Sequence, residues 1–179
     1  MVRHITRCTV AVLALIGSSS CGSDTPTAPS PPPIAQIAGV WRGTARTTSV
    51  TGGECVGSIL QSAVGGTDSI SASVSQSGAS VTAAVTTLSS GGVVNYTGSV
   101  GASALQLSWT NCTSCNLVGI RCPNVAPRDI RLLNSSITGT VTGNAISGTE
   151  VDTYNVVVSS TGAGVGSMTI NTSFTASRQ

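Results

Sequence analysis

Residues 70–109 decide the fold, and they read ISASVSQSGASVTAAVTTLSSGGVVNYTGSVGASALQLSW. Ile70, Ala72 and Val74 alternate with serines, and after a Ser-Gly-Ala-Ser turn the alternation resumes at Val81. A period of two is typical of strands with one buried face. Glycine-containing turns introduce two further alternating runs within this stretch. Four strands joined by short links predict an antiparallel meander.

The same pattern continues on both sides of this stretch. A helical turn is predicted at 34–38, followed by strands at 39–43 and 55–62; downstream come a hairpin about Gly143-Asn144 and strands at 151–158 and 167–176. About eight or nine strands are the number at which a barrel is filled by side chains or holds one small ligand. The sequence therefore predicts an all-β, antiparallel up-and-down barrel, or a flattened barrel or sandwich.

The composition excludes several kinds of function. Only 8% of the residues are charged, and all eight basic residues are arginines. Arg3 and Arg7 lie at the start, so six arginines face six acids in the rest, which gives no electrostatic basis for binding nucleic acid. The one histidine is His4, and lysine is absent, so a chain that loses its first segment lacks Ser-His-Asp, Cys-His, Schiff-base and histidine–metal chemistry. We therefore expect no enzyme activity, no cofactor and no metal.

The first segment predicts export and attachment to a membrane. Arg3 and Arg7 precede an apolar run at 10–16, which is too short to span a bilayer but has the length of a secretory signal core. The sequence Ser18-Ser19-Ser20-Cys21-Gly22 resembles the lipobox of bacterial lipoproteins, with Ser18 where that family usually has leucine. The resemblance implies a signal peptide at 1–20, a lipid anchor on Cys21 and a place on the outer (periplasmic or extracellular) side of a bacterial envelope membrane. Plain signal cleavage near Ser20 is the alternative.

A tether is predicted between this anchor and the barrel. Residues 21–33 contain Pro26, Pro29 and a run of three prolines, which keep a segment extended and unable to form a core. The barrel domain is then predicted at 34–179, held away from the membrane by the tether.

The two ends of the domain resemble those of lipocalins and related calycin barrels. Gly39-Val40-Trp41 is similar to the Gly-x-Trp opening of those proteins, and Arg178 follows the last predicted strand, where their conserved arginine stands. The resemblance implies that the Trp41 indole closes one end of the barrel while the guanidinium stacks on it, a contact of about 0.5 to 2 kcal/mol. An ordinary core tryptophan with a frayed C-terminal arginine is the alternative.

The small size of the inward-facing residues leaves two outcomes for the interior. Val74, Val85, Leu105, Leu107 and Trp109 are predicted to face inward, and aromatic residues make up only 3% of the chain. Because protein interiors are close-packed, the unfilled space either persists as a ligand-sized cavity or collapses into a flattened sandwich. The sequence favours the collapsed form. If a ligand binds, the candidate residues are Trp41, Tyr96, Leu105, Leu107, Trp109, Arg121, Arg128 and Arg131.

Four cysteines in the predicted barrel domain, Cys55, Cys112, Cys115 and Cys122, predict two disulfides, because the protein is expected to be exported. If each strand reverses the previous one, Cys55 begins a strand at one end of the sheet and Cys112 finishes one at the other, about 26 Å away and beyond the reach of a disulfide. Cys112 is therefore predicted to pair with Cys115, and Cys55 with Cys122. A four-thiolate zinc site and a redox Cys-x-x-Cys are the alternatives.

Two groups of charged residues are further candidates for binding or chemistry. Arg121, Arg128 and Arg131 could receive an anionic ligand, although a solvated loop explains them better. Glu150 and Asp152 share one face of a strand about 6.6 Å apart, a spacing that glycoside chemistry permits. Charges on an exposed strand face are the preferred explanation.

These observations predict a membrane-anchored lipoprotein that binds a small apolar ligand or an envelope component without catalysis. The alternatives are a structural or interaction surface protein without a ligand pocket and a carboxylate-based hydrolase. The first would expose apolar or arginine-rich surface around residues 112–131, whereas the second requires Glu150 and Asp152 inside a cleft.

Overall fold

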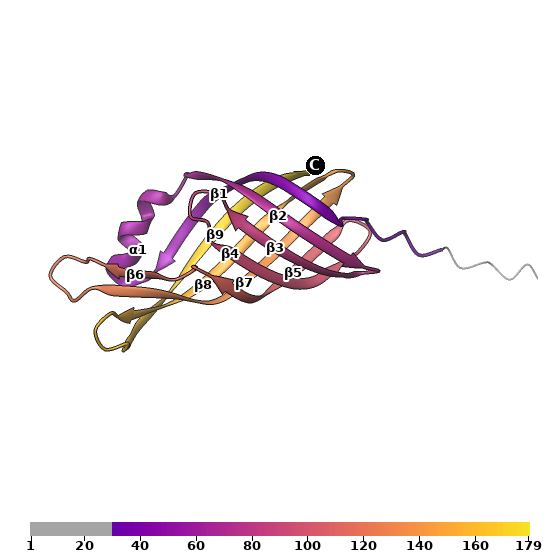
Figure 1. Cartoon of the computed structure of the whole chain (residues 1–179). Helices are drawn as coiled ribbons and strands as arrows, with labels where there is room; N and C mark the ends of the chain where they lie inside the picture. Colours follow the sequence, from indigo (N-terminus) through magenta and orange to yellow (C-terminus); the bar gives the residue numbers. More distant parts are fainter. Residues whose placement is uncertain (1–29) are drawn as a thin grey trace, which may run out of the picture. The chain divides into compact units, whose positions relative to one another are not determined.

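Eight antiparallel strands close into a barrel in the computed structural model, which describes residues 30–179 (Figure 1). Neighbouring strands follow the order β5-β4-β3-β2-β1-β9-β8-β7, and pairing of β5 with β7 closes the barrel, while β6 adds to β7. The prediction of an all-β antiparallel barrel is confirmed. The strands are β1 (Gly39–Gly52), β2 (Thr67–Ser77), β3 (Ser80–Thr87), β4 (Val93–Val100), β5 (Ala104–Thr113), β6 (Leu117–Ile120), β7 (Arg128–Thr142), β8 (Ala145–Val158) and β9 (Gly164–Arg178).

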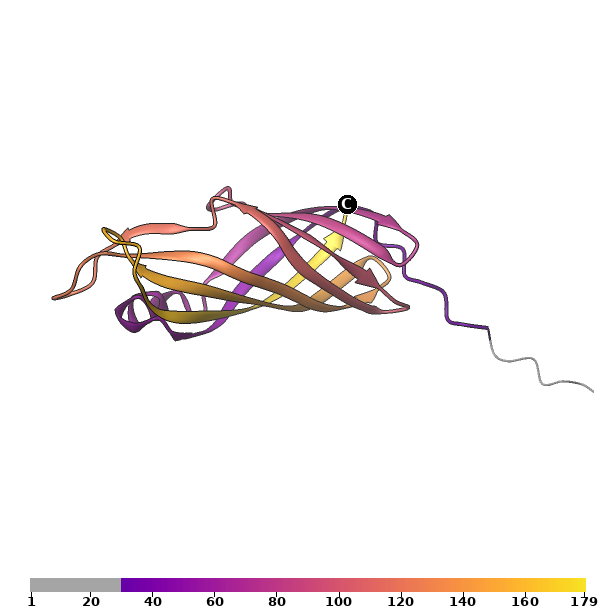
Figure 2. The ribbon, with the colours of Figure 1, turned by 90° about the horizontal axis from the view of Figure 1, so that it is seen from below.

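The barrel has a long side and a short side. β1, β7, β8 and β9 contain 14 or 15 residues each, whereas β2 to β5 contain between 8 and 11. β1 pairs with β2 only as far as Arg46, and β7 pairs with β5 only from Ser136 onward. The long strands therefore overhang at one end, where α1 (Glu54–Leu60), η1 (Gln61–Ala63) and β6 lie (Figures 1 and 2).

The segment before β1 closes the opposite end. Trp41 and Ile37 are each 1% exposed, and the Trp41 Nε1 donates to the Ile37 carbonyl oxygen at 2.8 Å. The Gln76 side chain accepts from the Ile37 amide and donates to the Ala35 carbonyl, so two backbone groups of this segment are satisfied. The helical turn predicted at 34–38 is wrong: these residues have no regular structure, because the backbone groups of Ala35 and Ile37 are hydrogen-bonded to the barrel.

Arg178 packs on Trp41, as the lipocalin resemblance implied. The two residues are register partners on β9 and β1, and the Arg178 Cζ lies 5.1 Å from the centre of the Trp41 ring. The guanidinium also donates to the Gln36 carbonyl, which ties the C-terminus to the closing segment. The closed barrel is consistent with a lipocalin-like fold.

Replacing Arg178 with alanine should lower the free energy of unfolding by about 1 kcal/mol, because the cation–π contact and the bond to Gln36 are both lost. Urea denaturation followed by tryptophan fluorescence measures the change. Arg42 is the matched control, since it is exposed on the adjacent position of β1. Equal effects of R178A and R42A would show that the contact with Trp41 contributes nothing.

The strand predicted at 55–62 is wrong, because this segment forms α1 and η1. Gly53 and Glu54 have positive φ angles of 81° and 50°, which turn the chain out of β1 and into the helix. Val56 is fully buried on the helix, and Cys55 and Leu60 also pack into a second core with Val50, Ile130, Val156 and Met168. Burying this group of apolar residues requires a helix that covers the overhanging ends of β1, β7, β8 and β9.

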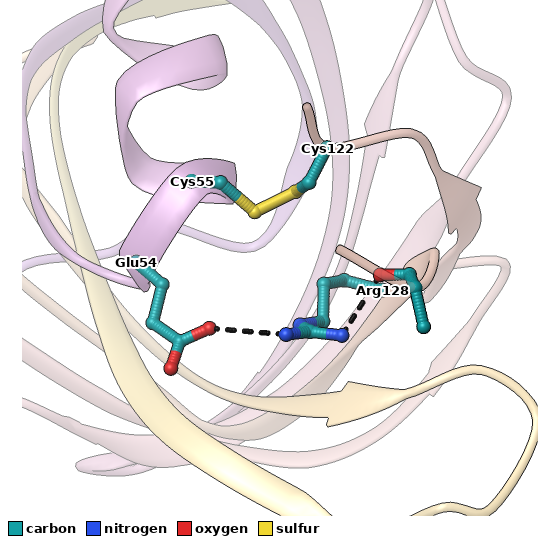
Figure 3. Close-up of polar contacts among 5 residues, drawn as sticks. Glu54, Cys55, Cys122 and Arg128 are labelled. Carbon is teal, nitrogen blue, oxygen red and sulfur yellow. Dashed lines mark hydrogen bonds and ion pairs between the residues drawn. A yellow bond between two sulfur atoms is a disulfide. The ribbon is translucent and has the colours of Figure 1, made fainter. Parts of the chain in front are cut away.

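Both predicted disulfides are present, and one of them holds α1. Cys55 is joined to Cys122, with a Cα–Cα distance of 5.8 Å (Figure 3). Cys112 is joined to Cys115, with a Cα–Cα distance of 5.9 Å. The argument that separated Cys55 from Cys112 is wrong, however, because β1 and β5 both end on the side of the barrel that carries α1. The two strands are instead four positions apart around the barrel in either direction.

Candidate functional site

The barrel contains a cavity of about 250 Å³, and its walls are mostly apolar. The interior thus keeps an open space instead of the collapsed form that the small inward residues favoured. The space persists because the closed set of strand pairings fixes the distance between opposite walls, while Trp41 and Ile37 close one end. The apolar lining residues are Trp41, Ala45, Ile70, Ala72, Val74, Ala83, Val85, Val94, Leu105, Leu107, Ile137, Ile146, Ile170, Phe174 and Ala176.

One side of this cavity is acidic. Glu150 and Asp152 on β8 line it together with Asp68 on β2, and Thr47, Thr87 and Thr172 complete the polar wall. Along β8, Glu150 and Asp152 share their face with Ile146, which belongs to the core. The preferred explanation that Glu150 and Asp152 lie on an exposed strand face is therefore wrong. Asp68 is exposed to solvent, so it marks the rim of the cavity.

Hydroxyl groups hold the two β8 carboxylates in place. The Tyr96 hydroxyl, which comes from β4, donates to the Glu150 Oε1 and lies 2.8 Å from the Ser135 Oγ. The Ser135 Oγ is also 3.3 Å from the same Glu150 oxygen. The Tyr154 hydroxyl donates to the Asp152 Oδ2 at 3.2 Å, whereas the Asp152 Oδ1 is buried and has no hydrogen-bond partner among the described residues.

A bulge in β7 brings Ser135 into this group. The register between β7 and β8 shifts between Leu132 and Asn134, so Leu133 has no partner and points outward, 53% exposed. The extra residue reverses the alternation, and both Ile130 before it and Ser135 after it face the interior. Ser135 is fully buried as a result.

Burial changes the acidity of four groups at this wall, the two carboxyl groups on β8 and the two tyrosine hydroxyls that contact them. It raises the pKa of Glu150 to about 7, and the neighbouring Asp152 carboxylate adds to the rise, while the hydrogen bonds from Tyr96 and Ser135 oppose it. Burial also raises the pKa of Asp152 and those of Tyr96 and Tyr154. Near neutral pH, small changes in the surroundings of Glu150 therefore change the protonation state of its carboxyl group.

The structure separates the ligand-binding candidates into two groups. Trp41, Leu105 and Leu107 line the cavity, and Tyr96 anchors Glu150. Trp109 packs against the main core, with its Nε1 buried and without a partner among residues 30–179. Arg121 and Arg131 are exposed outside the cavity.

Arg128 has a structural partner instead of a ligand. It is buried, it donates to the Ala126 carbonyl at 2.8 Å, and its guanidinium lies 3.5 Å from the Glu54 carboxylate at the start of α1 (Figure 3). The three arginines of this loop therefore do not form one anion site. Sequence reasoning missed Ser135 and Tyr154. The position of Tyr154 follows the parity of residues 146, 150 and 152 on one strand, whereas no local pattern indicated Ser135.

Comparisons with known proteins add no relative: no protein-family model, no curated protein and no solved structure matches the chain. Within residues 30–179 the structure contains no helix with the length and hydropathy needed to cross a membrane. In the same range, no three His, Cys, Asp or Glu side chains are grouped so that they could hold a metal ion. Cys21 and the predicted signal peptide lie outside the described residues.

Proposed function

We propose that this protein is an exported bacterial lipoprotein, anchored through Cys21, whose barrel binds a small, largely apolar ligand without catalysis. The observation that carries the proposal is the cavity of about 250 Å³ among aliphatic and aromatic side chains. A cavity of about 150 Å³ is enough to bind benzene. The cavity found here therefore suits a molecule of roughly ten non-hydrogen atoms, estimated by scaling from that case.

Filling the cavity should abolish binding. Ala72 lines the cavity, so A72F places a ring in the space that the ligand would occupy. We expect affinity for small hydrophobic probes such as 2-phenylethanol to fall at least tenfold, measured by isothermal titration calorimetry. A84F is the matched control, because Ala84 lies next to the inward-facing Ala83 on β3 and outside this cavity. Failure of the native protein to bind probes of this size, or equal binding by A72F and native protein, would contradict the proposal.

An interaction surface is a second candidate function, supported by exposed apolar residues near β6. Val118 is 75% exposed, and Leu117, Val125 and Leu133 are each about half exposed. This is the apolar exposure around residues 112–131 that the interaction hypothesis requires. It is compatible with the cavity, since the exposed side chains lie outside the barrel interior.

A carboxylate-based hydrolase is a third candidate, because Glu150 and Asp152 line the cavity as that hypothesis requires. The spacing of about 6.6 Å along the strand is within the range of paired glycosidase carboxylates. Tyr96, Ser135 and Tyr154 already occupy oxygens of both groups, however, and the cavity is small for a sugar with its leaving group. These contacts favour binding over hydrolysis.

A further inference from the structure

The cavity carries negative charge without a matching positive group. Asp68, Glu150 and Asp152 line it, whereas none of the six arginines in residues 30–179 does. Two of these arginines contact other residues instead: Arg128 pairs with Glu54, and Arg178 packs on Trp41. Nothing in the described part of the chain therefore neutralises Glu150 and Asp152 when both are ionised.

The hydroxyl groups around the carboxylates do not replace a counter-charge. Tyr96, Ser135 and Tyr154 are neutral donors, and one of the four carboxylate oxygens, the Asp152 Oδ1, is buried and lacks a hydrogen-bond partner within residues 30–179. A buried carboxylate that is ionised and incompletely hydrogen-bonded is costly unless a cation pairs with it. The site would gain most from a ligand that brings both a positive charge and N–H donors.

The lining of the cavity is apolar toward one end of the barrel and carries acidic and hydroxyl groups toward the other. Trp41, Val74 and Ala176 lie toward the closed end, and Asp68, Thr87 and Asp152 lie toward the end that carries α1. We propose that the ligand is an amphiphilic amine, with its protonated nitrogen bound between Glu150 and Asp152 and its apolar part directed toward Trp41. This inference rests on the proposed function and names the chemical class of its ligand.

An organic amine fits the acidic wall better than a metal ion does. Calcium takes six to eight oxygen ligands and zinc takes four ligands, commonly histidine or cysteine. The wall offers two neighbouring carboxylates from β8 beside aliphatic side chains such as Ile137 and Ile170. An ammonium group with an attached hydrocarbon matches both parts of that surface.

Binding of an amine should be linked to protons. The ionisable groups facing Glu150 are Asp152 and Tyr154 on its own strand, Tyr96 on β4 and, at the rim, Asp68 on β2; the facing residues on β7 and β9, Ser135 and Thr172, do not titrate. Because burial holds the Glu150 pKa at about 7, a cation must displace its proton below that pH. Affinity should therefore rise between pH 6 and pH 8, with release of a proton on binding near pH 7.

A matched set of three probes tests the inference: 2-phenylethylamine, 2-phenylethanol and phenylacetate, which share a shape and differ in charge. Calorimetric titration of the purified full-length protein at pH 8 should give at least tenfold tighter binding of the amine than of the alcohol, and the weakest binding for phenylacetate. The E150Q/D152N variant should lose the preference for the amine over the alcohol, because neither amide carries a charge. E54Q is the matched control, because Glu54 is an acid outside the cavity.

The outcomes separate this inference from the proposed function. Equal affinity for amine and alcohol in the native protein overturns the inference and leaves an apolar binding site in place. Absence of binding by all three probes and by the matching octyl amine, alcohol and carboxylate overturns both. If the double variant does not fold, titration of the native protein at pH 7 in two buffers of different ionisation enthalpy still decides, because an amine that binds without proton release contradicts the role of Glu150.

Discussion

Replacing Cys55 and Cys122 together with alanine should lower the free energy of unfolding by about 4 kcal/mol. The two residues are 67 positions apart in the chain, and a crosslink that closes a loop of this length removes much entropy from the unfolded state. The same bond fixes α1 over the second core, where Val56 and Met168 are almost completely buried. Chemical denaturation of the two proteins under oxidising conditions measures the difference.

The second disulfide supplies the control for this prediction. Cys112 and Cys115 are only three positions apart, so the same entropic argument gives about 2 kcal/mol for their replacement. The ratio between the two effects is therefore more informative than either value alone. A Cys112/Cys115 variant that is destabilised as much as the Cys55/Cys122 variant would show that loop entropy does not govern the stability of this barrel.

The alternation of the chain was sufficient to predict the barrel. β2, β3 and β4 each carry a period of two, and β5 carries it as far as Trp109, after which its register with β4 shifts. The turns between these strands contain glycine, so local sequence and tertiary structure agree. The pairing of Trp41 with Arg178 was also predictable, although from a resemblance and not from periodicity.

The errors arose where tertiary contacts override the local pattern. Residues 54–60 contain Val56 and Leu60 at helical spacing, but the segment is short and is flanked by turns, so alternation and helix were hard to separate. Its helical form depends on the core beneath it, which includes residues far away in the chain such as Met168. Counting this segment as a strand also placed Cys112 at the wrong end of the barrel. The predicted disulfide pairs are therefore correct, but the argument that gave them is not.

The acidic wall was missed for a different reason. Charged residues are rarely found inside proteins, so Glu150 and Asp152 were expected on an exposed strand face. Their even-numbered spacing from Ile146 on the same strand, which places all three on the interior face, was given too little weight. Their hydroxyl partners come from other strands, and one of them, Ser135, faces inward only because of the bulge at Leu133. The sequence of one strand does not predict the bulge in β7 or the contact that the Tyr96 side chain makes across the interior, because both depend on the neighbouring strands.

The stability of the protein should fall as the pH rises from about 5 to 8. Glu150 has a pKa of about 7 in the folded protein against 4.5 ordinarily, so the folded state holds a proton over this range that the unfolded state has lost. Its contribution is fully present below about pH 4.5 and is lost as the pH passes through 7. The expected loss is on the order of 3 kcal/mol, and Asp152, whose pKa is also raised, acts in the same direction. Urea denaturation at half-unit steps of pH measures the slope.

The variant E150Q should remove most of that slope, because glutamine can still accept from Tyr96 but carries no charge to bury. At pH 8 we therefore expect E150Q to be more stable than the native protein, a rare result for a substitution at a buried polar site. Few other groups titrate between pH 5 and pH 8, because the chain has no lysine and its one histidine is His4. The partly exposed Glu54, whose carboxylate lies outside the cavity, provides E54Q as a control that should keep the native slope. A native protein whose stability is constant or rises from pH 5 to 8 would show that Glu150 is ionised at little cost, and the acidic wall would then need no cation.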